Sequence, residues 1–67
     1  MPWTPERYPP AMRRLDTVVR LKAIEIANAL LEEGRAEGQC IRIAIAKARE
    51  WALSHRAEVP ISVQRGL

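Results

Sequence analysis

Residues 36–53 form the segment that most constrains how this chain can fold. It is the densest apolar run of the sequence and contains one of its two tryptophans. With the 3.6-residue period of a helix, its apolar residues fall on one stripe, made of Ile41, Ala44, Ile45, Ala48, Trp51 and Ala52. A chain of 67 residues makes one small domain, so this stripe must supply about half of its core.

The same segment also alternates between Ile41 and Ala48, which fits a strand with Ile41, Ile43 and Ile45 on one face. Three observations favour a helix. Alanine is the best helix former and a poor strand former, and the sequence offers no second strand for pairing. The pattern also continues without a break to Leu53. We therefore predict a helix over residues 37–54.

A first helix is predicted over residues 16–33, since no proline or glycine interrupts it before Gly34. Asp16 is a suitable N-cap, and Gly34 stands where a left-handed C-cap is needed. Its apolar stripe consists of Val19, Ala23, Ile26, Ala27 and Leu30, widened by Ile24 and Leu31. The short connection over residues 34–36 turns the second helix back against the first.

Residues 1–14 hold four of the five prolines and are expected to be extended, with at most one turn, near Thr4–Arg7. Trp3 and Tyr8 lie on either side of that turn. They form either a peptide-like recognition surface or a cover folded back over a bare helix face. The cover is favoured because large aromatic side chains supply the most buried area per residue.

These elements predict an all-α fold, an antiparallel two-helix hairpin with the proline-rich segment packed across it. The domain spans residues 1–55, and residues 56–67 are predicted to be a flexible tail. Gly38 is expected to let the second helix approach the first closely. The predicted core consists of Val19, Ala23, Ile26, Ala27, Leu30, Ile41, Ala44, Ile45, Ala48 and Trp51.

No catalytic group, cofactor site or metal site is predicted. The sequence has no phosphate-binding glycine loop, and one cysteine with one histidine cannot build a tetrahedral zinc site. Ser54 and His55 are neighbours on a helix, so their side chains point apart and cannot act as nucleophile and base. Cys40 is expected to be a small buried apolar residue. These patterns indicate that the chain is not an enzyme and has no small-molecule substrate.

A location in the cytoplasm is expected. The sequence shows no signal peptide and no apolar run of the roughly 20 residues that a membrane-spanning helix needs. A single unpaired cysteine also suits a reducing compartment.

The second helix is apolar over more than half of its circumference, with Ile43, Ala46 and Leu53 outside the main stripe. Residues 1–14, the tail or another copy of the chain must cover this surface. Exposed apolar patches mark partner surfaces. The sequence therefore predicts a non-enzymatic protein-interaction or regulatory module, with a homodimer as one form, and Trp3, Tyr8, Ile43, Ala46 and Leu53 as its candidate partner surface.

Nucleic-acid binding by a helix-turn-helix-like arrangement is the alternative. The net charge is +3, with basic segments at both ends of the chain and an acidic one between them. Arg42 and Arg49 are seven residues apart and share a helix face, and Gln39 lies near the start of the same helix. That helix start is mostly acidic or apolar, including Glu37, which is atypical of a helix that reads DNA bases.

Several stretches also carry a resemblance to a known family. They are Met1-Pro-Trp-Thr-Pro-Glu-Arg-Tyr-Pro-Pro-Ala-Met12, Val19-Arg20, Lys22-Ala-Ile-Glu-Ile-Ala-Asn-Ala-Leu-Leu-Glu-Glu-Gly34, Glu37-Gly38, Ile43-Ala-Ile-Ala-Lys-Ala48 and Trp51-Ala52. Over about residues 1–53 the chain resembles the N-terminal segment of the YdaT-like proteins of Bacillus, which are small uncharacterised bacterial proteins.

The sequence departs from that family at Asp16-Thr17, where Pro-Pro is usual, and it does not contain the second small domain that can follow there. A fainter likeness is to the ChaB-type cation transport regulators, small helical proteins that also open with Met-Pro; their role is not transferred to this chain. The YdaT-like resemblance implies a bacterial origin and this architecture, and it implies no activity and no functional residues.

Overall fold

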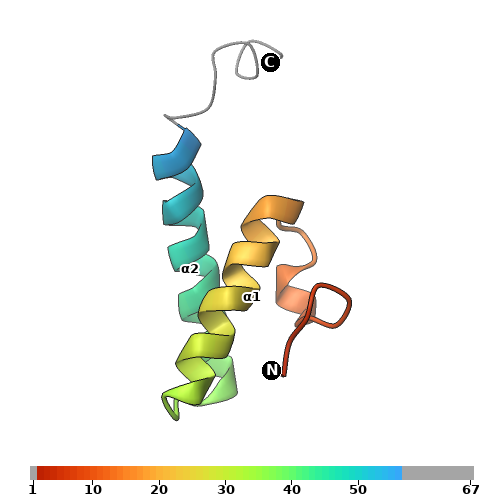
Figure 1. Cartoon of the computed structure of the whole chain (residues 1–67), viewed down its shortest axis with the longest axis vertical. Helices are drawn as coiled ribbons and strands as arrows, with labels where there is room; N and C mark the ends of the chain where they lie inside the picture. The colour runs from red at the N-terminus through yellow and green to blue at the C-terminus, as the bar shows by residue number, and fades with distance from the viewer. Residues whose placement is uncertain (1, 57–67) are drawn as a thin grey trace.

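The computed structural model describes residues 2–56, and side chains as far as residue 55. Two α-helices, α1 (Thr17–Glu32) and α2 (Glu37–Arg56), follow a short 3₁₀-helix, η1 (Pro10–Met12). The two α-helices run antiparallel and pack against each other (Figure 1). The predicted all-α hairpin is confirmed, and the alternating segment over residues 41–48 lies inside α2. Apart from Arg56, which ends α2, the predicted tail lies outside the described residues.

The turn between the helices is built by Gly34. Its φ of 95° lies in the left-handed region. Glycine adopts this conformation without steric conflict, whereas the Cβ of any other residue would clash with the backbone. The N–H of Gly34 donates to the carbonyl of Leu31 (3.0 Å), and the N–H of Arg35 donates to that of Leu30 (3.4 Å). This is a Schellman C-cap, as the glycine predicted. It satisfies the carbonyls of Leu30 and Leu31 in the last turn of α1 and turns the chain back.

The start of α1 is held differently from the prediction. Asp16 does occupy the N-cap position, but its side chain makes no capping hydrogen bond. The chain entering α1 is held instead by the guanidinium of Arg20. This group donates to three backbone carbonyls, those of Met12 (3.2 Å), Arg13 (3.2 Å) and Leu15 (2.8 Å). One arginine at the end of the first turn of α1 therefore fixes the end of η1 against the helix.

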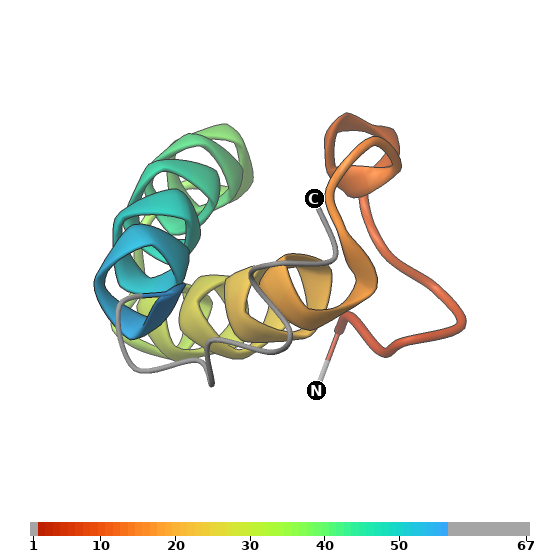
Figure 2. The ribbon, with the colours of Figure 1, turned by 90° about the horizontal axis from the view of Figure 1, so that it is seen from above.

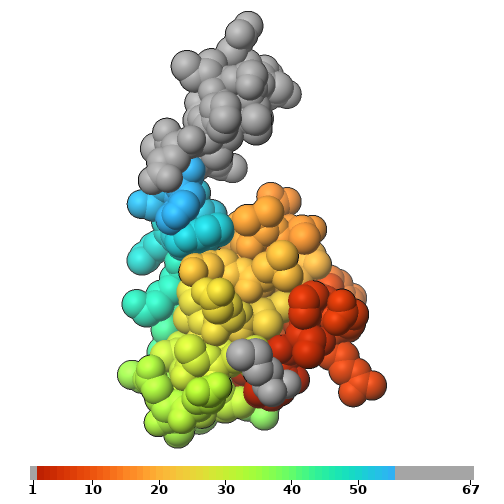
Figure 3. Space-filling model, in the orientation of Figure 1, coloured from red at the N-terminus to blue at the C-terminus, as the bar shows by residue number. Residues whose placement is uncertain are grey.

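The proline-rich segment covers α1 on the side away from α2, so α1 is the middle of three layers (Figure 2). The space-filling view shows α1 between the proline-rich segment and α2 (Figure 3). The predicted turn is present, because Thr4 and Arg7 exchange both backbone hydrogen bonds, at 2.8 and 3.0 Å. The Thr4 hydroxyl also accepts from the Arg7 N–H (3.0 Å). Trp3 and Tyr8 are half-buried against the core, as a folded-back cover requires.

The core is built mainly from small side chains of the two helices and from larger ones that precede α1. Its buried members are Met12, Leu15, Ala23, Ile24, Ala27, Ala44 and Ala48, with Cys40 buried nearby. Of the predicted core, the four alanines are fully buried, and Val19, Ile26, Ile41 and Ile45 pack against the core while staying partly exposed. Alanines at the contact let two helix axes come close, which leaves longer side chains at its edges.

Two residues of the predicted core were wrong. Leu30 and Trp51 are only half-buried and lie outside the core cluster. The last turns of α2, about residues 50–56, separate from α1 (Figure 1), and Trp51 belongs to this stretch of the helix. Lys22 of α1 covers its ring instead, with the ammonium 5.4 Å from the ring centroid.

The prediction for Gly38 was also wrong. Gly38 is exposed, and a Cβ built on it would meet nothing within 4 Å. It therefore does not mediate a close approach between the helices, because it lies in the first turn of α2, on a side that faces solvent.

Candidate interaction surface

The side of α2 that faces away from α1 carries a continuous row of exposed side chains. Arg42, Ala46, Arg49 and Leu53 are spaced four, three and four residues apart, which places them on one helix face. All four are exposed, and Leu53 keeps 66% of its surface open to solvent. These four residues are called the outer face of α2 below.

No part of the chain that the structure describes covers this face. The proline-rich segment, one of the covers foreseen for the second helix, packs on α1 instead (Figure 2). Within residues 2–55, neither Arg42 nor Arg49 takes part in an ion pair. The outer face of α2 thus combines an open leucine with two uncompensated positive charges.

The predicted partner surface is divided by the structure. Ala46 and Leu53 lie on the outer face of α2, and Ile43 lies half-buried beside it. Trp3 and Tyr8 belong to the segment on the opposite side of α1, where they contribute to the domain's own packing. The five residues therefore do not form one surface.

The predicted nucleic-acid contacts fall on the same side of α2 as Ala46 and Leu53. Arg42 and Arg49 belong to the outer face itself, and Gln39 is exposed one turn before Arg42. Two separate predictions, one apolar and one basic, therefore describe one strip of helix. The spacing of these residues in the sequence already places the basic and the apolar side chains on one helix face. The sequence did not show, however, that this face is the one left exposed.

A second exposed strip, on α1, was missed by the sequence reasoning. Val18 and Leu21 remain 60% and 45% exposed, and the exposed carboxylates of Glu25 and Glu32 continue the same side of the helix. Glu25 accepts from Lys22 at 2.8 Å and still keeps 70% of its side chain exposed. Val18, Leu21, Glu25 and Glu32 are called the outer face of α1 below. The sequence signal for this face is the apolar pair Val18 and Leu21, which lie two turns and one turn before Glu25 on the same side of the helix.

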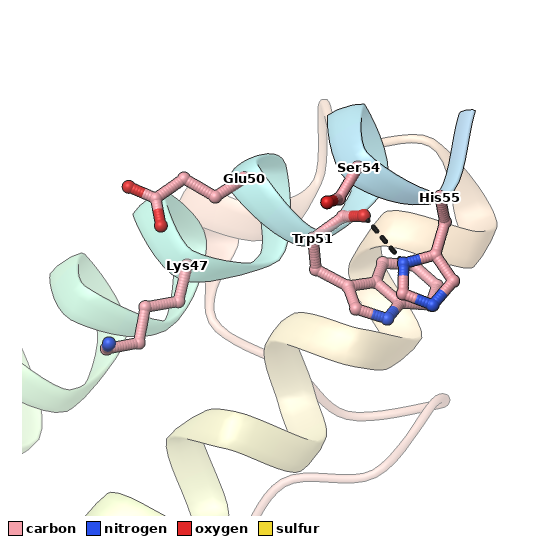
Figure 4. A pocket seen from close by; sticks show the side chains of 5 residues that line it. All are labelled: Lys47, Glu50, Trp51, Ser54 and His55. Atoms are coloured by element: carbon pink, nitrogen blue, oxygen red, sulfur yellow. Dashed lines mark hydrogen bonds between the residues drawn. The ribbon is translucent and has the colours of Figure 1, made fainter. Parts of the chain in front are cut away.

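A shallow hollow near the end of α2 does not have the character of a reaction site. It is lined by Lys47, Glu50, Trp51, Ser54 and His55, all from that helix. His55 stacks on Trp51 with centroids 4.5 Å apart, and its Nδ1 lies 3.0 Å from the Trp51 carbonyl oxygen. Lys47, Glu50 and the Ser54 hydroxyl point away from this pair (Figure 4). The side chains do not converge on a point where a substrate would sit.

Among residues 2–55, no three His, Cys, Asp or Glu side chains come together in a way that would hold a metal ion. Neither α1 nor α2 combines the length and apolar character needed to cross a bilayer.

The chain is similar in sequence to a protein of Bacillus subtilis named uncharacterized protein YdaT. The two are 52% identical over 52 residues, which make up 78% of this chain and 35% of YdaT. The chain therefore spans about a third of the length of this relative. The predicted resemblance to the YdaT-like proteins is confirmed, while the likeness to ChaB-type proteins is not shown. No protein-family profile matches the chain, and no solved structure matches it.

Proposed function

We propose that this YdaT-like chain is a non-enzymatic protein-interaction module of the bacterial cytoplasm, and that it docks through the outer face of α2. The observation that supports this most directly is the exposure of Leu53, at 66%, in a row with Ala46 and with two arginines that have no ion-pair partner within residues 2–55. Burying a leucine side chain fully contributes about 1.5–3 kcal/mol, so covering this row is favourable.

The mixed chemistry of the row supports a protein partner. A central apolar contact with arginine beside it is typical of protein interfaces, where arginine is enriched and tolerates partial burial. A partner that pairs with Arg42 and Arg49 must carry acidic groups about two helical turns apart, because the two arginines are seven residues apart.

Position-specific crosslinking tests this proposal in living cells. A photoreactive amino acid at Ala46 should give covalent protein adducts of the chain, and the same amino acid at exposed Glu6 should not. Leu53→Ser should remove the adducts at position 46 while leaving the helix content unchanged. Equal labelling from both positions, or no adduct at position 46, would contradict docking through this face.

Nucleic-acid binding is the second candidate, and the exposure of Arg42 and Arg49 on one face is the observation that favours it. The exposed Leu53 and Ala46 argue against it, since neither side chain can form a hydrogen bond to a phosphate or to a base edge. An apolar contact with a thymine methyl is all that they offer. Glu37 in the first turn of α2 adds a negative charge near the point where a reading helix contacts bases.

Titration with duplex DNA at two salt concentrations decides between the two candidates. If Arg42 and Arg49 contact two phosphates, replacing both with alanine should make the negative slope of log affinity against log salt shallower by about 2. Replacing Lys47, an exposed lysine outside the outer face, with alanine should change this slope less. Absence of binding at low salt would exclude the nucleic-acid candidate.

A further inference from the structure

The outer faces of α1 and α2 carry opposite charges in matching positions. Glu25 and Glu32 on α1 are seven residues apart, and so are Arg42 and Arg49 on α2. All four side chains are exposed. In an antiparallel pair of helices, residue numbers rise along one helix as they fall along the other, so all pairs of opposite residues have residue numbers with the same sum. Glu25 with Arg49 and Glu32 with Arg42 have the same sum, so a single register places both pairs opposite each other.

The same register also aligns the apolar residues of the two faces. Leu21 lies four residues before Glu25, and Leu53 lies four residues after Arg49, so Leu21 falls opposite Leu53. Both leucines are among the exposed large apolar residues, at 45% and 66%. Ala29 and Ala46, both small and exposed, lie near the middle of the alignment and let the helices approach.

These two faces cannot meet within one chain, because α1 and α2 already pack through their alanine sides and leave both outer faces open. We propose that the outer face of α2 docks on the outer face of α1 of a second copy of this chain, antiparallel, with Leu21 against Leu53. This rests on the proposed docking role of the outer face of α2, and it names the partner.

Such a contact joins two different surfaces. If the same two copies also make the reciprocal contact, a closed dimer results; if they do not, every copy bound through α2 still offers its own α1 face, and association continues into larger rings or open chains. The charges fix the register and the direction, and the leucine pair supplies the buried apolar area. Exposed ion pairs are weak, so the association is expected to need high protein concentration and to weaken with salt.

Sedimentation of the purified full chain tests the proposal with two charge-reversed variants. Arg42→Glu with Arg49→Glu makes both outer faces acidic, and Glu25→Arg with Glu32→Arg makes both basic. Each variant alone should associate at least about tenfold more weakly than the parent, a change of about 1.4 kcal/mol. An equimolar mixture of the two should recover association, because the acidic α2 face of one then meets the basic α1 face of the other.

A control matched to the arginine reversal has the same change of net charge away from both faces, namely Arg13→Glu with Lys47→Glu. It should associate as the parent does, and Leu53→Ser should weaken association without any change of charge. Circular dichroism establishes that each variant is helical. A chain that stays monomeric at millimolar concentration and low salt, reversals without effect, or a mixture that does not associate would each overturn the proposal. If the chain is monomeric while position 46 still crosslinks to another protein in cells, this inference falls and the proposed function stands.

Discussion

The side-chain amide of Asn28 pairs with the backbone of Trp3 as a neighbouring strand would. The Trp3 N–H donates to Asn28 Oδ1 (3.2 Å), and Asn28 Nδ2 donates to the Trp3 carbonyl oxygen (3.0 Å). Asn28 is 2% exposed, the one buried polar side chain among the described residues. The pair joins the two stretches that carry much of the YdaT-like resemblance, and so ties the proline-rich segment to the middle of α1.

Asn28→Ala should release the proline-rich segment. The change leaves the N–H and the carbonyl of Trp3 without these partners in a part-buried place, and we expect a loss of about 1–3 kcal/mol in the free energy of unfolding. Urea unfolding measures the loss, and amide exchange at Trp3 should become fast. Glu32→Ala on the exposed side of the same helix serves as the control and should stay within about 0.5 kcal/mol of the parent. Unchanged exchange at Trp3 would contradict this role of Asn28.

Arg20→Lys should behave almost like Arg20→Ala. The guanidinium reaches three carbonyls at once and also lies over the Tyr8 ring, 4.8 Å from its centroid. An ammonium is a point donor and cannot reproduce that planar fork. We expect each variant to lose about 1–2 kcal/mol of stability. Thermal unfolding tests this, and a lysine variant as stable as the parent would show that charge alone is sufficient.

Substitution by alanine should have opposite effects on stability at Gly34, which follows the end of α1, and at Gly38, which lies in the first turn of α2. Gly34→Ala places a Cβ at a φ of 95° and should destabilise the chain by about 1–2 kcal/mol. Gly38→Ala meets open space in a helical turn and should stabilise it by about 0.4–1 kcal/mol. Urea midpoints of the two variants measured together give the comparison. Destabilisation by Gly38→Ala would mean that a neighbour does pack against that position.

Ile24→Ala should cost more than Trp51→Ala, although the isoleucine side chain is smaller. Ile24 is 5% exposed within the core and should lose about 2–5 kcal/mol. Trp51 is half-buried under Lys22, and its removal should cost about 1–2 kcal/mol, below the roughly 3–5 expected of a buried tryptophan. Equilibrium unfolding of both variants decides the order. A larger loss of stability for Trp51→Ala than for Ile24→Ala would indicate that Trp51 is a core residue.

The sequence by itself determined the helices and the turn between them, because these depend on local chemistry. The alanine-rich pattern set the helical period, and Gly34 set the point of reversal, since only a residue tolerant of positive φ ends a helix in this way. It also determined that Ala46, Arg49 and Leu53 share a face, since a helix fixes which residues lie side by side.

Tertiary structure decided which faces are buried. Local periodicity does not reveal that η1 supplies Met12 to the core, that Asn28 receives Trp3, or that Trp51 lies where the helices diverge. Those outcomes depend on the close contact of alanines and on the side of α1 that the proline-rich segment covers. The outer faces of α1 and α2 are what that packing leaves exposed, and no single stretch of sequence contains that information.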